Sequence, residues 1–192
     1  MIKKYNDFKS EKNSAPREIL PAGGYVSKII SAKVESYDWG DVLILAYDIT
    51  EGEFANFFRR DYDNNPNEDK KWRGTLRLNI PNDSNDQKNE WRKRTFNNFV
   101  ACVEESNDGY HWDWDETKLK NKAIGILVRD REWEMNGNTG WTTEACNAAS
   151  VEQIREGKYR TPKPYALRKK AETAVQSFLS TGEIADDGDL PF

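Results

Sequence analysis

The order in which strand-like and helix-like segments follow one another constrains the fold of this chain more than any other feature. Segments 25–37 and 42–49 carry apolar residues on both parities, which predicts two long strands covered on both faces. The Asp-Trp-Gly-Asp sequence at 38–41 is typical of a turn, so the two strands are predicted to form a hairpin. Segment 73–80 alternates apolar and polar residues, which predicts a third strand, and Pro81 ends it.

The rest of the chain carries two more strand patterns and several helix patterns. Apolar residues spaced i, i+3, i+4 and i+7 predict a helix over 87–105, and three phenylalanines predict a short helix within 53–62. Segments 123–134 and 139–146 are predicted to be strands joined by an Asn-Gly-Asn turn. Ser150 and Gln153 have the spacing of a capping box, which predicts one short helical turn. A last amphipathic helix is predicted from about residue 167 to residue 178.

The predicted order is therefore strand, strand, strand, helix, strand, strand. An OB-fold places its helix between strands 3 and 4 in the same way. We predict a mainly β protein with added helices, built on an OB-fold-like five-stranded barrel; a longer Greek-key sandwich fits the order almost as well. The predicted parts are a partly ordered N-terminal arm (1–22), an OB-like domain (23–149), a helical and basic extension (150–182) and an acidic tail (183–192).

Charge is distributed unevenly along the chain. The formal net charge is -4, from 33 acidic and 29 basic residues. The last ten residues hold four of the acids and no base, so the rest of the chain has 29 of each and is neutral. The low overall pI therefore argues little against nucleic-acid binding by the body, where local patches decide. Aromatic residues are 12% of the chain and include seven Trp, which suits a small barrel, a stacking surface, or both.

Motifs for catalysis and cofactor binding are missing from the sequence. It contains one histidine, His111, and two widely separated cysteines, Cys102 and Cys146, so zinc sites and histidine-based triads are disfavoured. It has no phosphate-binding glycine motif and no nucleophile elbow. One alternative makes Asp113, Asp115 and Glu116 the Mg²⁺ ligands of a nuclease, but a solvated acidic loop is favoured. We expect a protein that is not an enzyme and binds no cofactor or metal.

The same composition also indicates the cellular compartment. The two cysteines have no paired spacing, which favours reduced thiols in a cytoplasm. No stretch approaches the ~20 apolar residues of a spanning helix. We expect a soluble, cytoplasmic protein with no membrane partner.

A candidate nucleic-acid surface follows from strand parity. Arg129, Arg131 and Trp133 share one parity of the strand at 123–134, and Arg73 and Arg77 lie opposite the leucine face of the strand at 73–80. Single-strand binding needs a basic groove for phosphates and flat rings for bases. The alternative is a solvated face whose arginines pair with neighbouring carboxylates; the candidate partners are Asp130, Glu132 and Glu134.

Other candidate residues lie outside these two strands. Trp39 is in the first hairpin turn and Trp141 opens the last strand, where each either contacts nucleic acid or packs. The segment 158–170 holds six bases and no acid. Its Lys163 and Arg168 bind phosphate, attract the acidic tail of the same chain when DNA is absent, or belong to a solvated linker. Packing roles are favoured for the remaining tryptophans, which are Trp72, Trp91, Trp112 and Trp114.

The C-terminal residues form a tail that is suited to binding by a partner molecule. Its acidic run precedes an apolar plug with a free α-carboxylate, which suits an apolar pocket with a basic rim. The tail residues concerned are Asp186, Asp187, Asp189, Leu190, Pro191 and Phe192. This segment resembles the C-terminal tip of bacterial and phage single-stranded DNA-binding proteins. The resemblance implies that the tip recruits replication and repair enzymes.

The body also looks like phage-encoded single-stranded DNA-binding replication proteins. The similarity is in Gly-Gly-Tyr-Val at 23–26, Asp-Ile-Thr-Glu-Gly-Glu at 48–53 and Gly-Lys-Tyr at 157–159. It implies a role in phage DNA replication and recombination in a bacterial cytoplasm, with single-stranded DNA as partner and a possible homo-oligomer. The inserted helix and the long C-terminal helix depart from the bacterial housekeeping protein, which puts its tetramer in doubt. The rival hypothesis is a protein–protein adaptor that mimics the host tip and binds no DNA.

Overall fold

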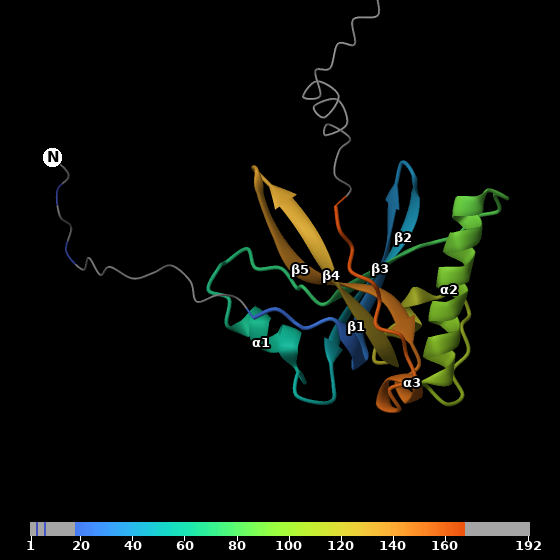
Figure 1. Cartoon of the computed structure of the whole chain (residues 1–192). Coiled ribbons are helices and arrows are strands. Elements are labelled where there is room, and N and C mark those ends of the chain that lie inside the picture. The colour runs from blue at the N-terminus through green and yellow to red at the C-terminus, as the bar shows by residue number, and fades with distance from the viewer. Residues whose placement is uncertain (1–2, 4–5, 7–17, 168–192) are drawn as a thin grey trace, which may run out of the picture.

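The computed structural model describes Lys3, Asn6 and residues 18–167 of the chain (Figure 1). The elements in chain order are β1 Gly23–Tyr37, β2 Gly40–Ile49, α1 Phe57–Asp63, β3 Thr75–Asn79, α2 Gln87–Glu105, a 3₁₀ turn Glu116–Leu119, β4 Ala123–Met135, β5 Asn138–Ala149 and α3 Val151–Arg155. The predicted hairpin, the third strand, the long helix and the final strand pair are thereby confirmed.

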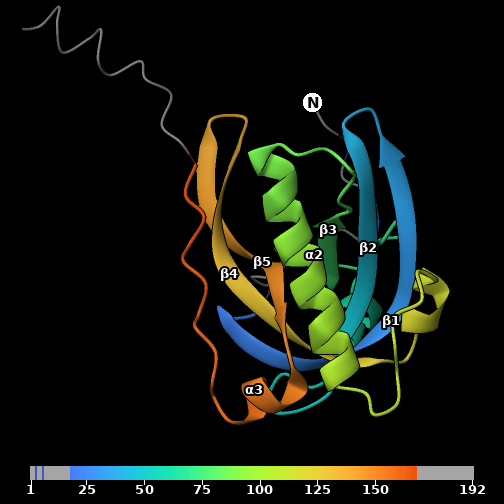
Figure 2. The same ribbon diagram turned by 90° about the vertical axis from the view of Figure 1, so that its right-hand side faces the viewer.

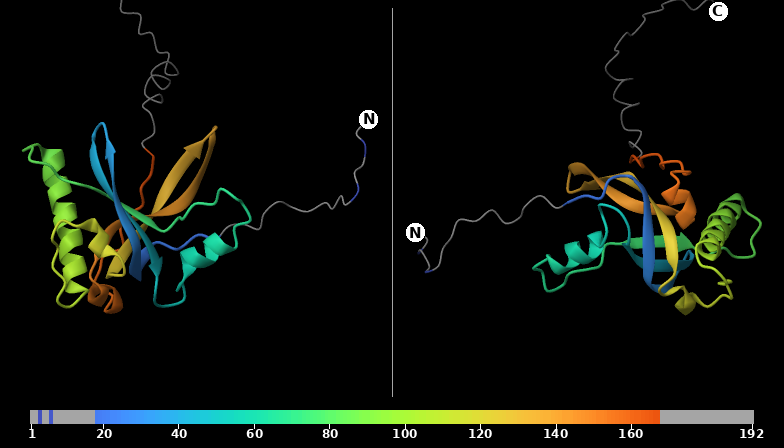
Figure 3. Two further views of the ribbon diagram at one scale, coloured as in Figure 1. Left: turned by 180° about the vertical axis from the view of Figure 1, so that it is seen from behind. Right: turned by 90° about the horizontal axis from the view of Figure 1, so that it is seen from below.

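The five strands form one antiparallel sheet in the order β3-β2-β1-β4-β5. The long strand β1 changes partner along its length, because residues 23–28 pair with β4 whereas residues 27–37 pair with β2. A register shift between Ile29 and Ser31 lies close to this change. The β1–β2 and β4–β5 hairpins consequently diverge beyond it, and Figure 1 and the left-hand view of Figure 3 show them as the arms of a V.

The sheet is open, so the predicted closed barrel is absent. A barrel with this strand order needs a ladder between β3 and β5, and none joins them among the described residues. Two features of the molecule account for the gap. β3 is only five residues long, and Asn98 of α2 donates from Nδ2 to the carbonyl oxygen of Ala148 on β5, at 3.0 Å. Figure 2 shows α2 lying across the space between the two hairpins.

The hydrophobic core lies where α2 covers the sheet. Ile29, Leu45, Leu76, Phe99 and Ile126 are fully buried and belong to one cluster. The amphipathic pattern of α2 predicts this face, and Asp86 caps the helix by accepting from the backbone N–H of Asn89. The β-rich body is thus held by a single core that extends from β3 to β4.

The short helix α1 begins at Phe57, inside the segment 53–62 where the pattern predicts a helix. Residues 52–56 form a turn in which Asn56 adopts a left-handed conformation (φ 57°). The carboxylate of Asp48, which is 9% exposed, accepts from the backbone N–H groups of Phe58 and Arg59 at 3.0 and 3.1 Å. This buried carboxylate at the end of β2 fixes where the helix starts.

The segment after α3 adds a short stretch to the sheet. Ser150 and Gln153 form the predicted capping box at the start of α3. Further on, the N–H of Tyr165 donates to the carbonyl of Asp130 (2.8 Å) and the carbonyl of Tyr165 accepts from Glu132 N–H (2.9 Å). The segment therefore covers part of the β4 edge beyond the end of its pairing with β1. The helix predicted at 167–178 and the tail lie outside the described residues, except for Leu167.

At the other end of the chain, Leu20 is 3% exposed and belongs to the core cluster, so the end of the predicted N-terminal arm packs on the body. Most of that arm lies outside the described residues. No helix within the described part of the chain is both long and apolar enough to cross a membrane.

Candidate nucleic-acid interface

A cavity of about 440 Å³ lies in the open seam of the sheet. Its walls come from the start of β3 on one side and from β4 and β5 on the other. Four arginines line it: Arg73, Arg77, Arg129 and Arg131. The structure thus brings together the two arginine pairs that strand parity singled out. Glu144 is the only carboxylate in the cavity lining, so the side chains that form the described walls carry a formal charge of +3.

Glycine at position 74 allows Arg73 to reach the cavity. A Cβ atom at Gly74 would lie 2.4 Å from the carbonyl oxygen of Tyr47 and 2.6 Å from the ring of Phe58. Only a residue without a side chain permits this close approach. The chain before β3 therefore passes tightly over β2 and α1.

The arginines of β4 share one carboxylate. Nε and Nη2 of Arg129 donate to Oε1 of Glu144 at 2.9 and 2.7 Å, and Nη1 of Arg131 donates to Oε2 at 3.2 Å. Arg129 also lies with its guanidinium carbon 4.9 Å from the ring centroid of Tyr165. Arg129 and Glu144 are direct cross-strand partners, so these side chains are on the same face of the hairpin.

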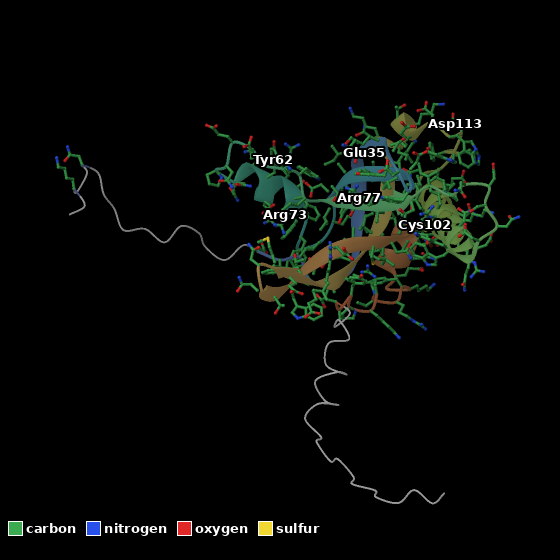
Figure 4. The ribbon with its side chains drawn as sticks, turned by 90° about the horizontal axis from the view of Figure 1, so that it is seen from above. Glu35, Tyr62, Arg73, Arg77, Cys102 and Asp113 are labelled. Carbon is green, nitrogen blue, oxygen red and sulfur yellow. The ribbon has the colours of Figure 1, made fainter. Side chains whose placement is uncertain are left out.

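The arginines of the opposite wall have separate partners. Nη1 of Arg73 lies 3.3 Å from Oδ1 of Asp61 on α1. Nη2 of Arg77 donates to the Tyr37 hydroxyl at 2.6 Å and lies 3.8 Å from Oε2 of Glu35. In Figure 4, Glu35 and Arg77 lie next to each other, and Arg73 lies further toward α1. The Lys33 and Tyr37 hydrogen bonds and the nearby Arg77 hold the pKa of the Glu35 carboxyl below its ordinary value.

The alternative prediction named the wrong carboxylates. Asp130, Glu132 and Glu134 are on the parity opposite to Arg129 and Arg131, and Glu132 instead accepts a hydrogen bond from the N–H of Leu167 at 2.9 Å. The arginines do pair with carboxylates, but the partners are on other strands and on α1.

Aromatic rings extend the arginine surface to the tip of the first hairpin. The rings of Tyr37 and Trp39 are stacked, with centroids 5.2 Å apart and planes 9° apart. Arg77 lies 5.9 Å from the Tyr37 centroid, and Arg92 of α2 lies 6.0 Å from the Trp39 centroid. Trp39 is 53% exposed, so part of its ring is accessible to solvent.

The second hairpin carries Trp133 and Trp141 near its tip on opposite faces. Trp133 is paired with Gly140 and shares the parity of Arg129 and Arg131, whereas Trp141 is paired with Glu132 on the other parity. A Cβ at Gly140 would lie 2.7 Å from Cζ2 of Trp133, so this ring packs directly on the neighbouring strand. Trp133 therefore extends the arginine face, and Trp141 is not brought to it.

The remaining candidates are placed as follows. Lys163 is exposed on the segment that leads to Tyr165. Arg168 and the tail residues Asp186 to Phe192 lie outside the described residues.

Sequence reasoning missed several residues of the cavity. Trp91 was assigned to packing, but it lines the cavity and is 60% exposed. The next residue, Arg92, is not part of the cavity lining. It is 7% exposed, although the helix pattern does not require burial there, and its Nε has no hydrogen-bond partner among the described residues. Glu144 could have been found from the two-residue turn at Asn136 and Gly137, because that turn fixes the register opposite Arg129.

The two aspartates of the acidic loop are paired with a lysine of the same loop. Asp113 and Asp115 both pair with Lys118, and the hydrogen bond from Lys118 holds the pKa of the Asp113 carboxyl below its ordinary value. Trp114 stacks on Phe96 with planes 12° apart, although Trp114 is 74% exposed. Within the described ranges, no three histidine, cysteine or acidic side chains are grouped as metal ligands.

No protein-family model matches the chain, and no curated protein is significantly similar to it.

Proposed function

We propose that this chain is a single-stranded DNA-binding protein whose body carries the strand across the arginine-lined cavity. The observation that carries the proposal is the meeting of Arg73 and Arg77 with Arg129 and Arg131 around one cavity that has a single carboxylate in its lining. Guanidinium groups match phosphate geometry and stay charged at every physiological pH. A row of them on two walls suits a polyanion better than a single small acid.

Exposed rings on both sides of the cavity support the choice of a single strand. Trp39 and Trp133 are 53% and 37% exposed and extend the two walls toward the hairpin tips. Unpaired bases stack on such rings with about 1–3 kcal/mol per base and with little dependence on sequence. Paired bases in a duplex do not offer their faces.

The strand order supports an OB-like interpretation of the body. Order β3-β2-β1-β4-β5 with a helix between β3 and β4 is the order of an OB-fold whose closing ladder is missing. We interpret the body as an OB-like domain opened at the seam where the cavity lies. OB-folds bind oligonucleotides through their strand faces and adjoining loops.

A titration of the whole chain with oligo-dT tests DNA binding. Stacking should quench tryptophan fluorescence, and log K should fall against log salt with a slope of about -0.7 per phosphate contact. A duplex of the same length is the control and should bind more weakly. Equal binding of the duplex, or binding that is insensitive to salt, would contradict the proposal.

We further propose that the C-terminal tip recruits replication or repair enzymes, in the context of phage DNA replication and recombination. This rests on the acidic run and apolar end at 186–192. Deletion of 183–192 should abolish capture of such enzymes and leave oligo-dT binding intact or tighter. Phe192→Ala should also abolish capture while keeping the charge. If the deletion variant still captures these enzymes, the tip has another role. If the deletion abolishes capture but the full chain does not bind oligo-dT, the adaptor hypothesis holds instead.

A further inference from the structure

The cavity has two chemically different zones. The four guanidinium groups that line it belong to side chains that are 31–54% exposed, and we call this solvent-accessible part its mouth. Five of the apolar residues that line it are at most 8% exposed. We propose that the cavity takes one unstacked nucleobase from the bound strand, while the arginines hold the phosphates on either side of that nucleotide. This inference rests on the proposed function and specifies what enters the site.

The apolar zone comes from residues that are otherwise part of the core. Leu20, Tyr47, Phe57, Phe58 and Val128 all line the cavity, although each is at most 8% exposed. Water gains few hydrogen bonds beside such a surface, so its replacement by the flat face of a base is favourable. A phosphate or a carboxylate would lose solvation there without a partner, which leaves the ring of the nucleotide as the suitable occupant.

The size and the polar groups of the cavity agree with this occupant. Small-molecule sites are typically ~300–1,000 Å³, and this cavity is about 440 Å³. The side chains of Thr75 and Thr143 line it from β3 and β5. A hydroxyl both donates and accepts, so two of them can meet the polar edge of any base without selecting one.

The charge of the mouth decides how the nucleotide is oriented. The arginines lie at both walls, and Arg131 has 51% of its side chain exposed, so phosphates approach from solvent while the base points inward. Bases in a duplex are stacked and paired and must be extruded at a cost before they can enter such a pocket. Entry of a base therefore favours single strands over duplexes independently of the exposed tryptophans.

The two cysteines of the chain provide the test. Cys146 lines the cavity as the extra residue of the β5 bulge, whereas Cys102 is buried in the core and 5% exposed. Burial raises the pKa of the Cys146 thiol, so alkylation by N-ethylmaleimide is followed at about pH 8.5, near the ordinary thiol pKa. The chain is used without any substitution, and mass spectrometry reports the alkylation of the two thiols separately. Cys102 is the internal control.

The three ligands are oligo-dT, a fully abasic oligonucleotide of the same length and a duplex, each at a concentration that saturates binding. Oligo-dT should slow alkylation of Cys146 about tenfold or more, because a base fills the cavity. The abasic strand keeps the phosphates and should slow it less than about threefold. Conversely, protein alkylated at Cys146 should lose affinity for oligo-dT and keep its affinity for the abasic strand.

Each other outcome counts against the inference. Equal protection by the abasic strand would mean that only backbone enters, and bound oligo-dT without protection would place the bases elsewhere; in both cases the proposed function stands. A Cys146 that never reacts in the free protein would contradict an open cavity. Failure of oligo-dT to bind at all would overturn the proposed function itself.

Discussion

The two walls of the cavity hold their arginines in different ways. On β4, Arg129 and Arg131 share the carboxylate of Glu144, and Arg129 is also covered by Tyr165. On the opposite wall, Arg73 and Arg77 have separate partners on α1 and β1. One wall is thus a preassembled pair of arginines with one shared counter-charge, and the other consists of two separate ion pairs. Preassembled donors lose less side-chain entropy when a phosphate binds.

The difference predicts that the β4 wall contributes more to affinity. We expect the double variant Arg129→Ala/Arg131→Ala to weaken oligo-dT binding about 100-fold, because each lost charged contact costs about 1.4 kcal/mol. The magnitude of the salt slope should fall by about 1.4, since each lost phosphate contact removes about 0.7. The double variant Arg73→Ala/Arg77→Ala should weaken oligo-dT binding less, by about 10-fold to 30-fold. Fluorescence titrations at several salt concentrations measure both. Equal losses for the two pairs would remove the distinction between the walls.

The rings at the two tips should act without changing the salt slope. Trp39→Ala and Trp133→Ala should each weaken oligo-dT binding by about 5-fold to 30-fold, since a stacked base contributes about 1–3 kcal/mol. Trp141→Ala is the matched control, because Trp141 is exposed on the face opposite to Arg129. If Trp133→Ala mainly lowers the melting temperature and leaves affinity unchanged, its packing on Gly140 is its whole role.

Local patterns were sufficient to predict the elements that form this site. The parity of β4 placed Arg129, Arg131 and Trp133 together, and the alternation of β3 placed Arg77 opposite its leucines. Such predictions depend only on neighbours along one strand. They succeed because β4 pairs with β5 in unbroken register from Val128 to Met135.

Long-range packing was not predictable in the same way. Closure of the sheet depends on whether β3 reaches β5, and that is decided by the length of β3 and by the position of α2, not by any local pattern. Trp91 lines the cavity for the same reason, because the helix that carries it lies beside the open seam. The start of α1 depends on a carboxylate nine residues earlier in the sequence, that of Asp48.

The shared carboxylate gives a smaller effect of opposite sign. Glu144→Gln keeps the shape of the side chain and removes the only negative charge of the cavity lining, so we expect oligo-dT binding to tighten about threefold to tenfold, most clearly at low salt. Glu134→Gln makes the same change of net charge on the other face of the hairpin and should change binding less than twofold. Weaker binding of Glu144→Gln would mean that the carboxylate is needed to position Arg129 and Arg131.

The smallest effect is expected from the counter-charge of the other wall. Glu35 lies 3.8 Å from Arg77 and is not part of the cavity lining, so Glu35→Gln should tighten oligo-dT binding by less than about threefold. The pKa of the Glu35 carboxyl is held below its ordinary value, so this group stays ionised from neutral pH down to about pH 5. The ratio of the affinities of Glu35→Gln and the unmodified chain should accordingly stay constant over that range. A ratio that approaches one as the pH falls would show that Glu35 becomes protonated in that range. If Glu35→Gln tightened oligo-dT binding as much as Glu144→Gln, the two walls would bind phosphate alike.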